Sequence, residues 1–115
     1  MTTMPPVNSR ANCAAVFDEQ TFDRDHVPAG HFHFFVVRGS TEPAGMLFGC
    51  PCGCGELKHV DFKGHADKRP MWEWDGNRDR PTLSPSINIL QFDESGNRAG
   101  EHWHGWLRAG QFTSV

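Results

Sequence analysis

The chain is 115 residues long, with 37% hydrophobic residues and a formal net charge of -3 from 11 Lys and Arg against 14 Asp and Glu. This charge balance, with basic and acidic residues interspersed, gives no electrostatic signature of a nucleic-acid partner. The start of the chain, "MTTMPPVNSR", lacks the apolar core of a secretory signal, and no stretch approaches the roughly 18 apolar residues of a membrane span. These features predict a soluble, cytoplasmic protein without a membrane partner.

The length predicts one compact domain. We expect a flexible N-terminal lead over residues 1–10 and a single β domain over residues 11–115. Nine Phe and four Trp must supply much of the buried area, while 12 Gly and 8 Pro indicate many turns. Apart from a short helix predicted around "AAVFDEQTF", no helical periodicity occurs. The fold class is therefore mostly β, with six to eight short antiparallel strands.

Aromatic and β-branched residues mark the strands predicted in the middle of the chain. "GHFHFFVVR" (30–38) alternates between two faces and predicts a central strand. "GMLFGC" (45–50) and "ELKHVDF" (56–62) predict a hairpin whose tip is the cysteine-rich turn between them. "MWEWDGN" (71–77) predicts a short strand that ends at an Asp-Gly turn.

Prolines and polar turns organise the C-terminal part. "RPTLSPSINILQF" (80–92) carries two prolines, which suits an edge strand or an extended loop because proline cannot donate to a strand ladder. "DESGNRAGE" (93–101) reads as a polar turn. "HWHGWLR" and "QFTSV" then predict a closing hairpin across the two-residue loop Ala109-Gly110.

The turn "GCPCGCGE" (49–56) places Cys50, Cys52 and Cys54 at alternate positions. Cytosolic thiols stay reduced, which disfavours a disulfide and favours a metal. Zinc takes four ligands in a tetrahedron, most often thiolates and imidazoles, and glycines in the turn permit the positive φ angles that aim several thiolates inward. We predict a Zn²⁺ site that also stabilises the small β domain. The alternatives are a metal-free reduced turn and a vicinal redox pair.

A fourth zinc ligand has to come from elsewhere in the chain. The candidates are Cys13, His59, His65, His102 and His104. His102 and His104 lie in an aromatic strand, where a buried imidazole needs a partner, and we favour His104. A second metal site at His31 and His33 is the weaker alternative to side chains that simply lie on a sheet face.

The loop "RPTLSPSI" is the second feature with functional character. Thr82, Ser84 and Ser86 place hydroxyl groups at alternate positions, and Arg80 adds a cation, so the loop is a candidate site for an anion or a peptide terminus. The alternative is a loop whose hydroxyl groups satisfy its own backbone. No Ser-His-Asp order and no phosphate-cradling glycine loop occurs in the chain.

The ordered combination "CPCGCG", "WEWDGN", "RPTLSPSI" and "WHGWLRAGQF" resembles a family of small proteins from bacteriophages and bacterial mobile elements. The resemblance covers residues 47–115. Some members carry the label ammonia monooxygenase, and others lie in operons with ubiquitin-like proteins and their conjugation enzymes.

The resemblance implies a role for particular residues of this chain. It matches the three cysteines together with His104 and Gly110, and so implies a Cys₃His site. It also matches the polar loop at Arg80, Pro81, Thr82, Ser84, Pro85 and Ser86. Many members have a cysteine directly before the histidine, where this chain has Trp103, so a ligand role does not extend to that position.

A metal site saturated by protein ligands favours a non-enzymatic binding module over an enzyme. We expect a zinc-binding β protein of phage or mobile-element type that engages a protein partner in the host cytoplasm, in defence or counter-defence. One alternative is a metal-dependent hydrolase with an open coordination position and a base among His102, Glu101, Asp61 and Glu73. The other is a structural virion or assembly protein.

Overall fold

The computed structural model describes residues 9–21, 25–64 and 71–115 of the chain. Over these ranges the protein is built from strands without an α-helix, which confirms the mostly β fold class, and no helix there is long and apolar enough to cross a membrane. The strands are β1 (Cys13–Ala14), β2 (Val16–Phe17), β3 (His31–Val36), β4 (Pro43–Gly49), β5 (Leu57–Phe62), β6 (Met71–Trp74), β7 (Leu83–Ser84), β8 (Ile87–Phe92), β9 (Arg98–Arg108) and β10 (Gln111–Ser114).

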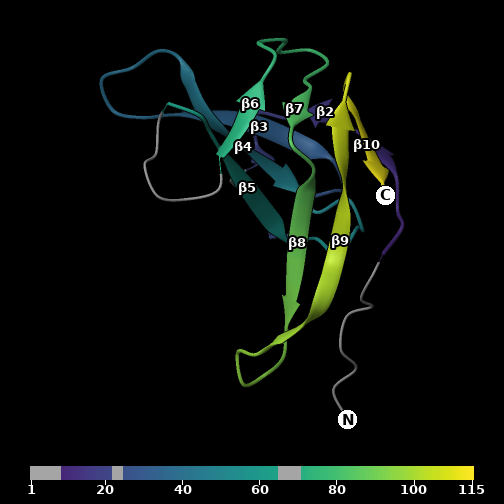
Figure 1. Cartoon of the computed structure of the whole chain (residues 1–115). Coiled ribbons are helices and arrows are strands. Elements are labelled where there is room, and N and C mark those ends of the chain that lie inside the picture. Colours follow the sequence, from purple (N-terminus) through teal and green to yellow (C-terminus); the bar gives the residue numbers. More distant parts are fainter. Residues whose placement is uncertain (1–8, 22–24, 65–70) are drawn as a thin grey trace.

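The described strands form two sheets (Figure 1). One sheet has the order β2-β3-β4-β5-β6-β7, and the other has the order β1-β10-β9-β8. Ten strands occur rather than six to eight, and the pairs β2-β3 and β5-β6 are parallel rather than antiparallel. The chain passes from the first sheet to the second between β7 and β8, within the predicted polar loop.

Aromatic side chains from both sheets make the core. Phe32 and Phe48 of the six-stranded sheet are fully buried, as are Trp103 and Phe112 of the four-stranded sheet. The Phe48 and Phe112 rings stack across the two sheets with centroids 5.3 Å apart. The expected central strand is β3, which lies between β2 and β4, and its buried residues alternate with more exposed ones as the sequence predicts.

The cysteine turn closes the β4-β5 hairpin, as predicted. The strands pair as far as Gly49 and Leu57, and the Cys50 N–H donates to the Glu56 carbonyl at 3.0 Å. Gly55 has a φ of +88°, and a Cβ there would lie 2.1 Å from Nδ1 of His26. Glycine at this position therefore serves both the turn and the close approach of the neighbouring loop.

Two short edge strands, Cys13–Ala14 and Val16–Phe17, lie in the described part of the segment where a short helix is predicted. Cys13 pairs with Phe112 in one sheet, and Val16 pairs with His31 in the other. The free edges of β10 and β3 offer hydrogen bonds that override the weak helical pattern. Ordered pairing also begins inside the predicted lead, because Ser9 forms a bridge with Trp103. Residues 1–8 lie outside the described residues.

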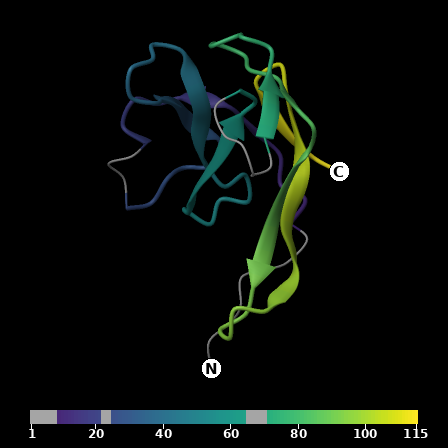
Figure 2. The same ribbon diagram turned by 60° about the vertical axis from the view of Figure 1, so that its left-hand side comes forward.

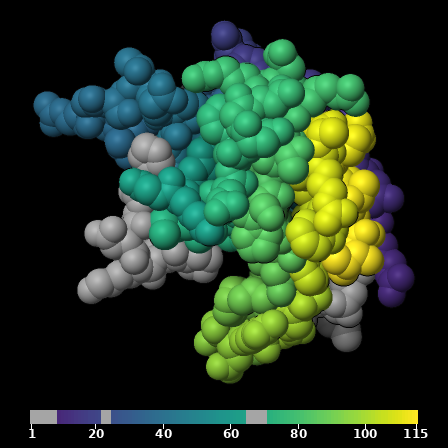
Figure 3. All heavy atoms as spheres, turned by 45° about the horizontal axis from the view of Figure 1, so that its top comes forward, coloured from purple at the N-terminus to yellow at the C-terminus, as the bar shows by residue number. Residues whose placement is uncertain are grey.

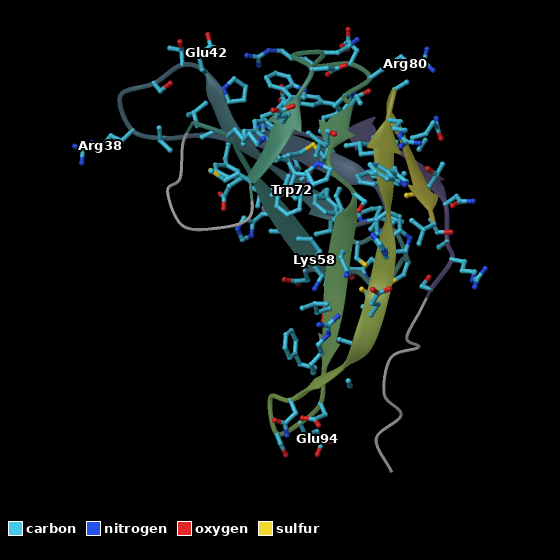
Figure 4. All side chains as sticks on the ribbon, in the orientation of Figure 1. Arg38, Glu42, Lys58, Trp72, Arg80 and Glu94 are labelled. Carbon is cyan, nitrogen blue, oxygen red and sulfur yellow. The ribbon has the colours of Figure 1, made fainter. Side chains whose placement is uncertain are left out.

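The β8-β9 hairpin projects beyond the rest of the molecule (Figures 2 and 3), and Glu94 marks its tip (Figure 4). β9 is 11 residues long, and its pairing with β8 is interrupted by two register shifts. The first shift lies between Ile89 and Leu90. This shift determines on which face of β9 the side chains of Glu101 and His102 lie.

Candidate metal centre and candidate active site

Cys50, Cys52, Cys54 and His102 form one compact group, which can hold a metal ion. Their ligand atoms all lie within 4.8 Å of one another. The Cys50 and Cys52 sulfurs are 3.4 Å apart, and the Cys52 sulfur lies 2.9 Å from His102 Nε2. A tetrahedral zinc ion with bonds of about 2.3 Å to sulfur places its ligand atoms roughly 3.8 Å apart. The donor types fit one tetrahedral ion, and the 3.4 Å and 2.9 Å contacts would have to lengthen by less than about 1 Å to hold it.

The electrostatics of the group also suit a cation. Burial raises the pKa of the Cys50 and Cys52 thiols, and neighbouring cysteines raise it further for Cys50. Burial also lowers the pKa of His102, assisted by Lys58, which lies on β5 beside β8 (Figure 4). Without an ion these shifts favour neutral Cys50 and Cys52 thiols and a neutral His102 imidazole. A divalent cation would supply the charge that stabilises buried thiolates.

Zinc binding to the metal-free protein at pH 7 should release at least two protons, one each from Cys50 and Cys52, because both thiols are protonated before the ion binds. His102 is already neutral at this pH and should release none. Zinc affinity should consequently fall as the pH falls. Calorimetric titration in two buffers of different ionisation enthalpy measures the released protons, and a binding heat that is the same in both buffers would contradict this prediction.

The fourth member of the group is His102, whereas the sequence favoured His104. His102 is 4% exposed, and its Nδ1 lies 2.8 Å from Gln91 Oε1. When Nδ1 donates to this oxygen, Nε2 presents its lone pair to the cysteines, the arrangement typical of metal-binding histidines. Of the other candidates, Cys13 lies in β1, His59 is more than half exposed near Asp61, and His65 lies outside the described residues.

A β-bulge explains why His102 and His104, only two positions apart, contact different groups: His102 contacts the cysteines, and His104 contacts Ser86. His104 pairs with Asn88, and Trp103 pairs with Ile89, but Leu90 pairs with Glu101. His102 is thus the extra residue on β9. In a regular strand His102 and His104 would share a face. The bulge instead turns His102 toward the buried face with Gln91, and it places Glu101 on the opposite face with His104.

A second constellation lies on that opposite face. The Ser86 hydroxyl oxygen is 3.0 Å from His104 Nε2, and His104 Nδ1 is 3.8 Å from a Glu101 carboxylate oxygen. The other Glu101 oxygen accepts a hydrogen bond from the Asn88 side chain at 3.1 Å. A hydroxyl, an imidazole and a carboxylate in this spatial order are the parts of a serine nucleophile with its base and orienting acid.

Two members of the constellation, His104 and Glu101, border a small surface pocket. The side chains of His104 and Glu101 are 28% and 37% exposed, and Ser86 is half-buried. His104 and Glu101 line a pocket of about 180 Å³ together with Ser9, Arg10 and Val115. The base and the carboxylate are therefore accessible from solvent at this pocket.

Residues 19–115 match the family described as "Bacterial ubiquitination-like system serine protease (BubE)". The chain belongs to this family. The family description agrees with the ubiquitin-like operons that the sequence resemblance implied. No curated protein and no solved structure matches the chain.

Sequence reasoning missed the constellation of this BubE-family chain because it looked for a Ser-His-Asp order. Here the order along the chain is Ser86, Glu101, His104, and such sites are defined by geometry rather than by order. Ser86 is nevertheless among the predicted loop residues, whereas the sequence favoured His104 as a zinc ligand rather than as a catalytic base. The missing information was the pairing of β8 with β9.

The remaining residues of the predicted ligand-binding loop make mostly internal contacts. The Thr82 hydroxyl accepts from the Ala109 N–H at 2.8 Å, and the Arg80 N–H donates to the Asn77 side chain at 2.9 Å. Ser84 is exposed in β7. Of the four predicted loop residues, Ser86 is the one whose side chain contacts a histidine, His104. Binding of an anion or a peptide terminus by this loop stays a prediction.

Proposed function

We propose that this protein is a serine hydrolase that cleaves a peptide or ester bond in a bacterial ubiquitination-like system. The observation that carries the proposal is the 3.0 Å contact between the Ser86 hydroxyl and His104 Nε2. The description of the family as a serine protease supports it independently. The protein partner that the sequence predicts would then be the substrate.

In the proposed mechanism Ser86 Oγ attacks the substrate carbonyl carbon while His104 Nε2 accepts the hydroxyl proton. The bond to the leaving group breaks, and His104 returns the proton to that group, which leaves an acyl group on Ser86. A water molecule then attacks the acyl carbon with the same proton transfers. This releases the acid and restores the free Ser86 hydroxyl.

Glu101 would hold the His104 ring in the required orientation and stabilise the imidazolium that forms. Its 3.8 Å distance to Nδ1 is longer than a hydrogen bond, and such contacts often tighten only when substrate binds. The Asn88 amide holds the second carboxylate oxygen, so Asn88 is a positioning residue that acts through Glu101.

Asn88→Ala should lower kcat/KM about tenfold, because one hydrogen bond to a charged group contributes about 1.5 kcal/mol. In the Glu101→Ala background the same change should have almost no effect, since Asn88 would then have no carboxylate to hold. Steady-state hydrolysis of p-nitrophenyl acetate by the four proteins of this double-mutant cycle gives the comparison. A tenfold loss that persists without Glu101 would show that Asn88 acts by another route.

We further propose that the metal is a structural Zn²⁺ ion. Three thiolates and one imidazole match the preference of zinc, and four protein donors complete its tetrahedron. No coordination position is then left for a water nucleophile, which disfavours the metal-dependent hydrolase predicted as an alternative. Reduced thiols of this kind persist in the cytosol, which supports a cytoplasmic location.

The function favoured from sequence is a non-catalytic binding module. Such a module would also contain the closed metal site, but it would not require the contact between Ser86 and His104. Pre-steady-state hydrolysis of p-nitrophenyl acetate separates the two functions. The zinc-loaded protein, with its thiols bound to the ion, should release a burst of about one p-nitrophenol per chain, because deacylation follows acylation. Absence of a burst and of steady turnover in the folded, zinc-loaded protein would favour the binding module.

A further inference from the structure

We propose that the metal group positions Glu101 through the β-bulge at His102, so that a metal ion controls turnover at an active site it does not contact. This inference rests on the proposed hydrolase function. It makes His102 and the three cysteines positioning residues for catalysis, in addition to their contribution to stability.

The two sites share one short piece of backbone. Glu101 and His102 are adjacent in β9, yet Glu101 contacts Asn88 on one face while His102 contacts Gln91 and Cys52 on the other. This arrangement exists only because His102 is the unpaired residue of the bulge. Whatever holds His102 in place therefore also determines the face on which the Glu101 carboxylate lies.

Loss of the bulge has a defined consequence. In a regular ladder His102 would pair with Leu90, and Glu101 would pair with Gln91, whose side chain lies on the buried face. A one-residue change of register moves a side chain to the opposite face of a sheet. Glu101 would then point away from His104 and leave the base without its orienting carboxylate.

Contacts on His102 hold the bulge from outside the β8-β9 ladder. Its backbone carbonyl accepts from the Ser9 N–H at 3.0 Å, and its ring lies 2.9 Å from the Cys52 sulfur in the turn between β4 and β5. A metal ion would replace this sulfur contact with coordinate bonds to a hairpin of the other sheet. Ser86 lies before β8 and His104 lies where the β8-β9 register is regular, so the contact between these two residues should survive metal loss.

The test compares His102→Ala with Glu101→Ala, the double variant and His102→Cys, by zinc content and by hydrolysis of p-nitrophenyl acetate. His102→Ala should lose the zinc and lower kcat about 10⁴-fold with little change in KM, the size of loss expected when an orienting carboxylate is withdrawn. Glu101→Ala should keep the zinc and lose the same factor, and the double variant should lose no more. His102→Cys should retain zinc in a four-cysteine site and recover kcat to within a few-fold of the wild type.

Two results would overturn the inference. One is a folded, zinc-free His102→Ala protein with wild-type kcat, and the other is a double variant whose two losses multiply. If His102→Ala does not fold, Gln91→Ala answers the same question, because it leaves all four metal donors intact and removes the Nδ1 contact, together with a long 3.4 Å hydrogen bond to the exposed Phe92 carbonyl. Its kcat should fall in the wild type and stay unchanged in the Glu101→Ala background. Failure of the hydrolase function itself would be recognised separately, by a Ser86→Ala variant as active as the wild type.

Discussion

Ser86→Ala should lower kcat for p-nitrophenyl acetate by about 10⁴-fold or more and leave the melting temperature and zinc content unchanged. The proposed nucleophile is lost, whereas the half-buried side chain contributes to the described contacts through its hydroxyl at His104 alone. The residual rate should be close to the background of the ester in buffer. Turnover, melting and elemental zinc are measured on the same preparation.

Ser84→Ala is the matched control for this experiment. Ser84 lies in the same loop and is exposed, but it belongs to β7 and pairs with Glu73. Its removal should change kcat by less than about twofold, in the range of an ordinary surface substitution. Equal losses in the two variants would point to disruption of the loop rather than to a nucleophile. Retention of activity by Ser86→Ala would exclude the proposed mechanism.

Removal of the metal should lower the free energy of unfolding by about 3 kcal/mol or more, and the melting temperature by about 10 °C or more. The ion would cross-link the β4-β5 turn of one sheet to β9 of the other, through Cys52 and His102 among its ligands. The aromatic core between the sheets is retained, so a complete loss of folding is not expected. Chelation followed by thermal melting, and recovery on addition of zinc chloride, measures the effect.

Histidine variants provide the matched comparison for the metal. His102→Ala should lose the zinc and melt like the chelated protein, while His104→Ala should keep one zinc per chain and the wild-type melting temperature. The two residues are separated by one position, yet they lie on opposite faces of β9. Identical melting curves with and without zinc would contradict the proposal that the ion stabilises the fold. Zinc loss on replacing His104 would restore the ligand predicted from sequence.

The predictions that the structure confirms depend on local sequence patterns, namely turn residues and the alternation of apolar with polar residues. The glycines and the proline between two apolar runs specify the cysteine turn, and the pattern "WLRAGQF" specifies the last hairpin. Both depend on neighbours within a few residues. The strand at 30–38 is likewise predicted from local sequence alone, because alternate residues along it face the core. Together these local signals were sufficient for the mostly β class and for three of the four members of the metal group.

Pairing between distant segments explains what the sequence did not predict. The bulge at His102 depends on the register of β8 against β9, which no residue in "EHWHGW" specifies by itself. A strict period of two places His102 and His104 on the same face, and so it predicts neither that His102 joins the three cysteines nor that His104 contacts Ser86. The parallel pairs β2-β3 and β5-β6 arise in the same way, from chain crossings rather than from local pattern.

Reaction of the zinc-loaded protein with a fluorophosphonate, followed by peptide mapping of the adduct, shows whether Ser86 is a nucleophile activated by His104. We expect one adduct per chain, on Ser86, that forms far more slowly in His104→Ala because the base at 3.0 Å is missing. An adduct on Ser84 or on a cysteine, or no adduct under conditions that label a known serine hydrolase, would contradict it.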